Sequence, residues 1–283
     1  MKKIILILFL LTQINYSQSF LLLFDGYTPA NSEVSTYNNS LTTKLSDIQL
    51  ARIDRLVTMI KDSLGVSSLS SLGDVLYLFA NETQEAALKN LIKRSHDGQI
   101  VGTAPTFTQW QGFTGSGAGY INTNWNFSTQ KVAYTQNSAS FGIYNRTNGS
   151  SAGFQGIVDG AGIGVLIQVR NTSTNIWRIN NSGTLAGSTA NSSGHFSLTR
   201  RAADSIFVYR NGIELTKSAV VSSSTFYNGN AFIFATNSNG SVAGYVNYQL
   251  AIAYFLKGWT AIQERKLNNC FEWYMDQLGT GIQ

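Results

Sequence analysis

The sequence is poor in cysteine, proline and charge. Cys270 is the single cysteine among 283 residues, so an internal disulfide is excluded. One cysteine with two histidines, His96 and His195, does not make a zinc cluster. Charged residues make up 12%, against about 25% in ordinary soluble domains. These shortages exclude a disulfide scaffold and a cysteine–histidine metal site.

Basic residues are scattered. The net charge is +5, and Lys2 and Lys3 supply two of these charges. Elsewhere the notable basic pairs are residues 93–94 and 200–201, and no basic stripe with interleaved aromatic residues is present. Nucleic-acid binding is therefore not expected.

Glycine, small polar residues and aromatic residues are abundant instead. The chain has 26 glycines, is dense in Ser, Thr and Asn, and is 12% aromatic. The aromatic content supports a sizeable core, while neutral polar side chains supply the surface. This balance favours an all-β protein of the kind found among secreted and viral proteins.

The N-terminus has the order of a secretory signal peptide. Lys2 and Lys3 precede an apolar run at residues 4–11 and a polar stretch at residues 12–19. Cleavage is expected after Ser19. The alternative is a retained, non-spanning hydrophobic tail, because residues 20–24 are apolar again but the stretch is too interrupted for a spanning helix.

The region after the leader is expected to be extended and then helical. Residues 20–45 are predicted to be extended, with a turn at residues 25–26. Helical apolar spacing then runs from Ser46, with Gln49 at the capping-box position, to a stop at Gly65. A second helix is predicted from Glu82 to Arg94, and the apolar segment at residues 75–80 fits either a helix or a strand.

From about residue 97 the pattern changes to short strands separated by Gly, Asn and Ser turns. This spacing predicts a β-sandwich. The strongest local signal is Asn211-Gly212, which favours a two-residue hairpin because both positions tolerate positive φ. The predicted strands are 106–110, 119–122, 138–145, 154–158, 164–169, 176–180, 194–200, 205–210, 231–236 and 247–256.

A final helix closes the chain. Thr260 and Gln263 repeat the capping-box spacing, an apolar stripe follows, and Gly279 ends it. The stripe is expected to pack against the sandwich or the earlier helices. We thus predict a leader at residues 1–19, an extended segment plus small helical region at 20–96, and a sandwich with a C-terminal helix at 97–283.

An ordered set of motifs between residues 75 and 282 resembles the laminin-G/concanavalin A-like proteins of bacteriophage virions (tail, fibre or spike) and related prophage-borne bacterial proteins. The motifs are AALKNL at 86–91, PTFT at 105–108, QGFTG at 111–115, GYINTNWN at 119–126, SASFG at 138–142, VYRNG at 208–212 and FEWYMDQLG at 271–279. The resemblance implies a concanavalin A-like jelly roll on a virion, with a part in host attachment.

Two functions are expected from the resemblance and the composition. The first is a non-catalytic attachment module that recognises a host surface polysaccharide or glycan, together with other virion proteins. The alternative is a structural, oligomeric virion protein or secreted bacterial surface protein without a specific sugar ligand. In either case a homo-oligomer, including a trimer, is expected, at the virion surface or outside the cell.

Catalytic chemistry is not expected. The acids within the predicted sandwich are Asp97, Asp159, Asp204 and Glu214, and they do not form the carboxylate cluster of a glycoside hydrolase. Asp204 and Glu214 flank the predicted hairpin, and Asp159 alone is too little for a calcium site. The glycines at residues 160–164 lack the spacing of a phosphate loop, so no cofactor and no metal are expected.

Sugar binding requires aromatic faces beside amide or guanidinium donors. The sequence places several such residues in or near predicted loops. The candidate ligand-binding residues are Trp125, Tyr144, Trp177, Arg178, Asn180 and Tyr227. Trp125 lies within the GYINTNWN motif, which favours a structural role for it, and Trp177 fits equally well as a core residue of a strand.

Overall fold

The computed structural model describes residues 26–219 and 225–282, so the predicted leader at residues 1–19 lies outside the described part of the chain. Four α-helices and two 3₁₀ turns are present within it. The helices are α2 (Ser32–Asn39), α3 (Asp47–Leu64), α4 (Gln84–Leu88) and α5 (Ala261–Gln277), and the turns are η1 (Leu69–Ser71) and η2 (Arg94–His96).

Eight strands form one sheet, here called the helix-side sheet. Along its main path the order is β13-β12-β11-β6-β17-β4-β3, and β1 also pairs antiparallel with β17. The strands are β13 (Ile213–Ser218), β12 (Ser205–Arg210), β11 (Gly194–Ala202), β6 (Ala139–Asn145), β17 (Gln249–Leu256), β4 (Gly112–Thr114), β3 (Thr106–Thr108) and β1 (Gly73–Leu78).

Nine strands form the second sheet, here called the outer sheet. Its main order is β10-β9-β8-β7-β14-β5-β2, and the hairpin β15–β16 joins it where β15 runs parallel to β7. The strands are β10 (Leu185–Ser188), β9 (Thr174–Asn181), β8 (Gly164–Asn171), β7 (Gln155–Val158), β14 (Asn230–Ile233), β5 (Gly119–Asn126), β2 (Gln99–Gly102), β15 (Thr236–Ser238) and β16 (Ser241–Ala243).

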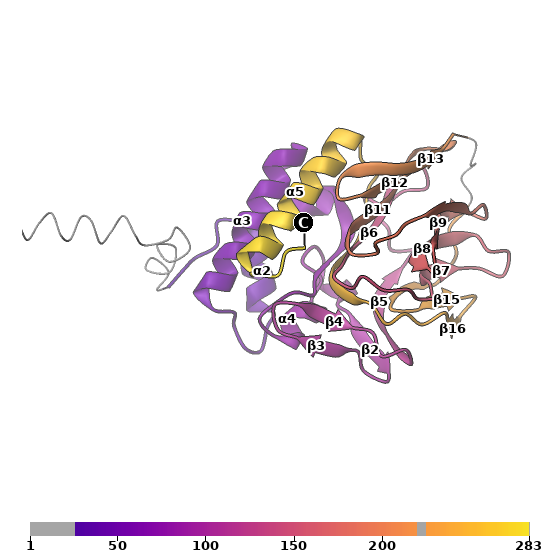
Figure 1. Cartoon of the computed structure of the whole chain (residues 1–283). Helices are drawn as coiled ribbons and strands as arrows, with labels where there is room; N and C mark the ends of the chain where they lie inside the picture. The colour runs from indigo at the N-terminus through magenta and orange to yellow at the C-terminus, as the bar shows by residue number, and fades with distance from the viewer. Residues whose placement is uncertain (1–25, 220–224, 283) are drawn as a thin grey trace, which may run out of the picture.

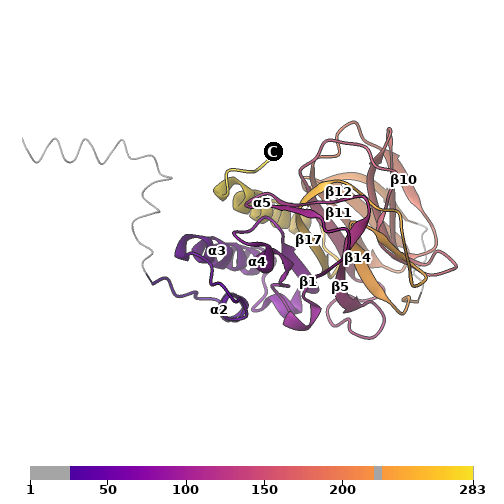
Figure 2. The same cartoon turned by 90° about the horizontal axis from the view of Figure 1, so that it is seen from below.

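The elements stack in three layers: helices, helix-side sheet and outer sheet. Helices α3 and α5 lie side by side on one side of the sandwich, as Figures 1 and 2 show from two directions. One core lies between the two sheets and includes Trp125, Phe141 and Trp177. A second core lies between the helices and the other face of the helix-side sheet, and includes Leu56 and Phe271. The prediction of a mostly β sandwich with an N-terminal helical region and a C-terminal packing helix is confirmed.

Strand β1 shows why the segment at residues 75–80 was ambiguous in the sequence. All six of its residues are buried. Val75 and Tyr77 face the core between the sheets, whereas Leu76 and Leu78 face the helices. A strand buried on both faces has no alternation of apolar and polar residues, so its period is hidden.

Three local signals are confirmed. The Ser46 hydroxyl accepts a hydrogen bond from the Gln49 amide at the start of α3, and Gly65 ends that helix in the left-handed region. Thr260 and Gln263 form a complete capping box on α5. Asn211 and Gly212 both have positive φ, 53° and 72°, and join β12 to β13 in a two-residue turn.

Two predictions of local secondary structure are wrong, one of an extended segment and one of a helix. Residues 20–45 were expected to be extended, but Ser32–Asn39 forms α2, which buries only Val34 and Tyr37 and therefore has a weak apolar signal. The helix expected from Glu82 to Arg94 is shortened to α4, because Lys89 is already extended. Asn90 then forms a bridge with Tyr77 of β1 and adds to the sheet instead.

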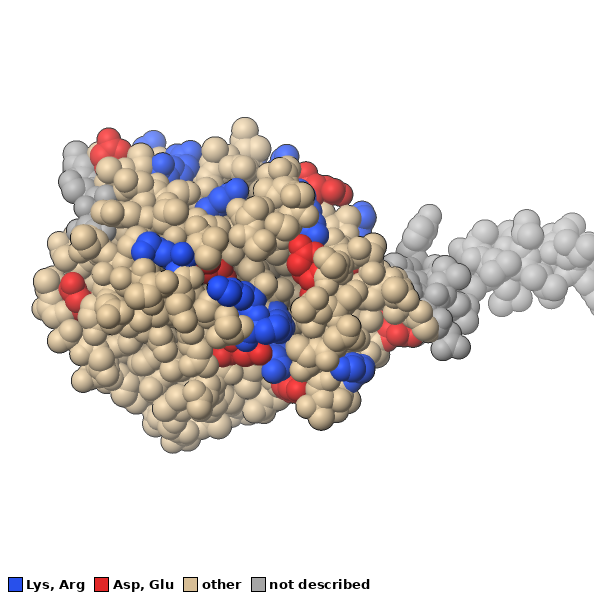
Figure 3. Space-filling model, turned by 180° about the vertical axis from the view of Figure 1, so that it is seen from behind, with Lys and Arg blue, Asp and Glu red and all other residues tan. Residues whose placement is uncertain are grey.

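The surface carries few charges. Figure 3 shows one face on which uncharged residues dominate and the basic groups are interspersed with acidic ones. Within residues 26–219 and 225–282, no helix combines the length and the hydropathy needed to cross a membrane.

Candidate functional site

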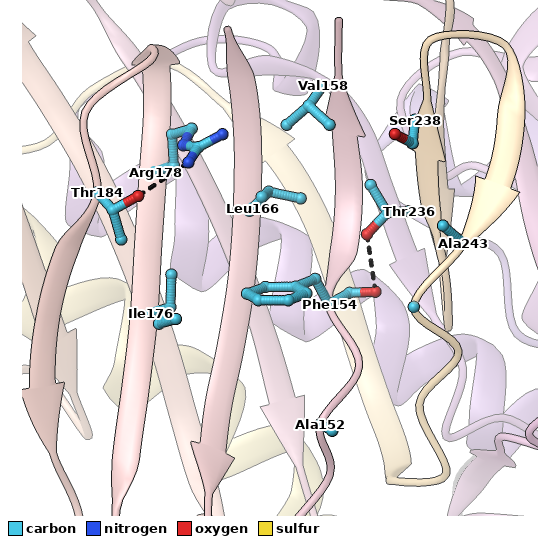
Figure 4. Close-up of a pocket in the computed structure, with 11 residues that line it drawn as sticks. Ala152, Phe154, Val158, Leu166, Ile176, Arg178, Thr184, Thr236, Ser238 and Ala243 are labelled. Atoms are coloured by element: carbon cyan, nitrogen blue, oxygen red, sulfur yellow. Dashed lines mark hydrogen bonds between the residues drawn. The ribbon is translucent and has the colours of Figure 1, made fainter. Parts of the chain in front are cut away.

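A groove of about 440 Å³ lies on the exposed face of the outer sheet, over β7, β8 and β9 and beside the β15–β16 hairpin (Figure 4). Strand alternation builds its floor. On β9, Trp177 and Ile179 point into the core, so Ile176 and Arg178 point outward. On β8, Val165 and Ile167 are in the core and their neighbour Leu166 faces outward.

The floor of the groove is apolar, and one aromatic ring lies over it. Phe154, which immediately precedes β7, is only half-buried and is not part of either core. Figure 4 shows its ring pointing toward the strand that carries Leu166, with Ile176 beyond it. Leu166 and Arg178 are directly paired across β8 and β9, so the guanidinium and the apolar floor are neighbours.

A polar group borders the groove at the Arg178 end. The Arg178 guanidinium donates hydrogen bonds to the Gly162 carbonyl and, at 2.8 Å, to the Thr184 hydroxyl. The Asp159 carboxylate accepts from the backbone amides of Ala161 and Ile163 at 2.9 and 2.7 Å, which fixes the β7–β8 turn beside Arg178. Burial lowers the pKa of Arg178 and the Asp159 charge opposes this, yet an arginine remains positively charged in protein surroundings.

The β15–β16 hairpin forms the opposite wall. The Thr236 hydroxyl donates to the Phe154 carbonyl at 3.1 Å, and the Phe154 amide donates to the Gly244 carbonyl at 2.9 Å. These two bonds hold the segment carrying the ring against the hairpin. Ser238 and Ala243 complete this wall. The groove thus offers one ring, an apolar floor, a guanidinium and hydroxyls, which suits a flat ligand with a polar perimeter.

A larger hollow of about 580 Å³ lies between the β12–β13 hairpin and α5. Its lining mixes polar residues, such as Asn211, Arg265 and Asn269, with apolar ones, Ile213 and Ala261. The one aromatic residue in its lining, Tyr209, is 1% exposed, so no aromatic face is available there. The groove on the outer sheet is therefore the stronger candidate for a sugar.

The six ligand-binding residues predicted from the sequence do not come together. Trp125, Tyr144 and Trp177 are fully buried and present no ring face at the surface. The Trp177 indole donates to the Asn175 amide oxygen at 2.8 Å, and the Tyr144 hydroxyl donates to the Glu272 carboxylate at 2.8 Å. These three rings serve as core residues.

Asn180 is also buried. Its side-chain amide donates to the Gln136 carbonyl, and its side-chain oxygen accepts from the Tyr134 hydroxyl. Arg178 lies in the groove. Tyr227 is half-buried, and its hydroxyl lies near the β15–β16 turn, 3.9 Å from the Cβ position of Gly240. Arg178 and Tyr227 are the two candidates that remain partly exposed, and their part in binding stays a prediction.

Arg178 is the one predicted candidate among the residues that line the groove in the described part of the chain; those that the sequence did not single out include Phe154, Leu166, Thr184 and Thr236. The alternation along β9 was a usable signal for this face. If Trp177 is placed in the core, Arg178 must point to the surface, and the residues on neighbouring strands follow once the pairing is known.

Two titratable side chains away from the groove, His195 and Glu264, are buried within the fold. His195 is fully buried, with its ring nitrogens 2.9 Å from the Tyr254 hydroxyl and 3.2 Å from the Asn268 oxygen, and burial lowers its pKa to about 4. Glu264 of α5 is also fully buried, and burial raises its pKa to about 8, an effect that the Ser197 hydroxyl partly offsets.

The acids are dispersed. Asp204 precedes β12, whereas Glu214 is paired with Tyr209 at the other end of that strand, so the two carboxylates are not neighbours. Glu214 instead makes an ion pair with Lys217. In the described part of the chain, no three His, Cys, Asp or Glu residues are grouped as metal ligands.

Comparisons with known proteins bear on the fold only. No protein-family profile matches the sequence, and no curated protein matches it. Among solved structures, the chain is similar to domain 4 of AbnA, an extracellular GH43 arabinanase from Geobacillus stearothermophilus solved in complex with arabinotriose. The identity is 14%, the TM-score 0.46, and the match covers 69% of this chain and 99% of that domain.

Botulinum neurotoxin binding domains are similar as well. The serotype D binding domain matches with 8% identity and a TM-score of 0.48, over 71% of this chain and 52% of that one. The chain HCR/D-Sa-GBL1/C matches with 12% identity and a TM-score of 0.52, again over 71% and 52%. The protein therefore spans about half the length of these two chains. Of the three matches only HCR/D-Sa-GBL1/C has a TM-score above 0.5, and at 12% identity that likeness shows the fold alone.

Proposed function

We propose that the protein is a non-catalytic attachment module that binds a surface glycan in the groove of the outer sheet. The observation that carries the proposal is the Phe154 ring over an apolar floor, between Arg178 and the hydroxyls of Thr236 and Ser238. A pyranose has an apolar face that packs on an aromatic ring, and its hydroxyls accept from a guanidinium and exchange hydrogen bonds with hydroxyl groups.

The absence of carboxylates from the groove supports the non-catalytic part. The residues described as lining it include no Asp and no Glu. Hydrolysis of a glycosidic bond ordinarily needs a pair of carboxyl groups about 5–9.5 Å apart. Asp159 is near Arg178, but its Oδ1 is engaged by two backbone amides.

The setting that we propose is the surface of a virion, or the outside of a cell. It follows from the resemblance of the ordered motifs to virion sandwich proteins and from the predicted leader. The largely uncharged surface fits a ligand recognised by hydroxyls and ring faces more than one held by charge (Figure 3).

Replacing Phe154 by alanine should weaken glycan binding at least tenfold, because the sugar loses its aromatic platform; tenfold corresponds to about 1.4 kcal/mol. The fold should survive, since the ring is half-buried and outside both cores. A glycan array with host surface polysaccharides identifies the probe, and calorimetry with the oligosaccharide that binds best measures affinity.

Phe207→Ala is the matched control, because Phe207 is a second half-buried ring, with the Arg201 guanidinium 3.9 Å above it, on the other sheet. Its loss should leave affinity unchanged. Equal weakening by both variants, or an array without any binding, would count against the groove.

A structural, oligomeric role without a sugar ligand is the second candidate. The specific observation in its favour is the open edge of the helix-side sheet at β13, which carries exposed apolar side chains.

A further inference from the structure

The helix-side sheet ends in an open edge at β13. This strand has six residues and, in the described part of the chain, pairs only with β12. The strands at the other ends of the two sheet paths are shorter: β3 has three residues, and β10 and β2 have four each. The six-residue β1 is covered on its free side, where the Leu91 amide donates to the Leu76 carbonyl. An open edge exposes backbone donors and acceptors that another strand can pair with.

Exposed apolar side chains gather at this edge. Ile213 is 70% exposed and Leu215 42%, and both belong to β13. Ile262 of α5 is 68% exposed. The two elements meet, since the Cβ position of Gly212, in the turn before β13, lies 2.9 Å from the Arg265 Cα. Three of the five large hydrophobic side chains exposed in the described chain therefore belong to β13 and the helix beside it.

Two opposite charges share one face of β13. The pairing with β12 places Lys217 opposite Phe207 and Glu214 opposite Tyr209, with an irregularity at Leu215. The rings of Phe207 and Tyr209 are stacked on the same face of β12. Directly opposed residues share a face in an antiparallel sheet, so Glu214 and Lys217 also share it. Their charged groups are 3.6 Å apart, with side chains 36% and 65% exposed.

We infer that a second copy of this chain pairs with β13, antiparallel and about a two-fold axis. One register matches the charges: Glu214 lies opposite Lys217 of the second copy, and Lys217 opposite Glu214 of the second copy. In that register Leu215 lies opposite Thr216 beside the axis, where its exposed apolar surface is buried. A strand with Glu at its second position and Lys at its fifth is self-complementary under a two-fold operation.

Lysine on an edge strand usually discourages pairing, because a buried or like-charged ammonium is unfavourable. Here the partner strand supplies a carboxylate for each lysine. The groove lies on the other sheet, over β7 to β9, so pairing at β13 leaves both grooves of the dimer open. This pairing does not depend on the proposed glycan binding.

Sedimentation of the full chain with charge-reversed variants tests the pairing. The protein should have twice the 30.9 kDa mass of one chain at micromolar concentration. Glu214→Lys puts Lys opposite Lys twice, and Lys217→Glu puts Glu opposite Glu twice, so each variant alone should be monomeric. An equimolar mixture should restore the dimer, because each variant then meets its opposite charge across the axis.

Recovery in the mixture separates pairing between copies from the ion pair within one chain, since neither variant regains its internal pair by mixing. Arg55→Glu, which reverses an exposed charge on α3, is the control and should stay dimeric. Circular dichroism establishes that each variant is folded. A monomeric or trimeric wild-type protein, single variants that stay dimeric, or a mixture that stays monomeric would each overturn the inference.

Discussion

Replacing Glu264 by glutamine should abolish a loss of stability that the wild-type protein suffers between pH 6.5 and 8. Glu264 of α5 is fully buried, and burial raises its pKa from 4.5 to about 8. The folded protein therefore holds the proton to much higher pH than the unfolded chain does. Such a group contributes its full stability below pH 4.5 and loses it progressively up to pH 8.

His195 of β11, in the adjacent helix-side sheet, gives the stability the opposite pH dependence. Burial lowers its pKa from 6.5 to about 4, so its contribution is complete above pH 6.5 and is lost as the pH falls toward 4. Between pH 4.5 and 6.5 the two slopes oppose each other. Above pH 6.5 only the Glu264 slope remains, on the order of 1.4 kcal/mol per pH unit.

The expected result is a fall of roughly 2 kcal/mol in the free energy of unfolding of the wild-type protein from pH 6.5 to 8. Glu264→Gln should show almost no slope there, because its amide does not titrate. Urea unfolding, followed by tryptophan fluorescence at a series of pH values, measures the free energy of unfolding of the wild-type protein and of the variant. Asp62→Asn, which removes an exposed acid on α3, should keep the wild-type slope. A slope in the Glu264→Gln variant equal to that of wild type would contradict the assignment.

Trp125→Ala should destabilise the protein by about 3–5 kcal/mol, the usual cost of deleting a large buried ring. The Trp125 ring is fully buried, with centroids 4.8 Å from Phe127, 5.2 Å from Phe255 and 5.4 Å from Tyr134. Removal leaves a cavity among three aromatic rings, and thermal or urea unfolding measures its effect.

The comparison with Phe154→Ala gives this prediction its control. Trp125→Ala should lower stability and leave glycan affinity unchanged in the molecules that remain folded. Phe154→Ala should weaken glycan binding and leave the protein folded. If Trp125→Ala abolishes binding without loss of stability, the sequence-based assignment of Trp125 to the ligand is right and its role in the core is secondary.

Local signals in the sequence predicted the elements that depend on neighbours in the chain. The capping box of Thr260 and Gln263 and the Asn211-Gly212 turn involve residues at most three apart, so their geometry is encoded locally. Elements that depend on residues far away in the sequence were harder to predict. Helix α2 has a mostly polar sequence. Its buried Tyr37 donates a hydrogen bond to the Ala86 carbonyl, 49 residues away.

The groove that we propose as the site could be predicted from the sequence less well than the fold, for a related reason. An aromatic residue near a turn fits either a core or a surface position until strand pairing is known. Trp177 and Arg178 are adjacent on β9, yet one is in the core and the other lines the groove. Phe154 lines the groove because Thr236 and Gly244, about 80 and 90 residues later, hold its backbone. The residues next to Phe154 in the sequence do not indicate these two distant contacts.

The central claim, a glycan in the outer-sheet groove, is tested most directly by a crystal structure of the protein with the oligosaccharide that binds best on the array. We expect a sugar ring packed on Phe154, with a hydroxyl within hydrogen-bond distance of Arg178. A sugar bound instead in the hollow between the β12–β13 hairpin and α5, or on any face away from Phe154, would contradict it.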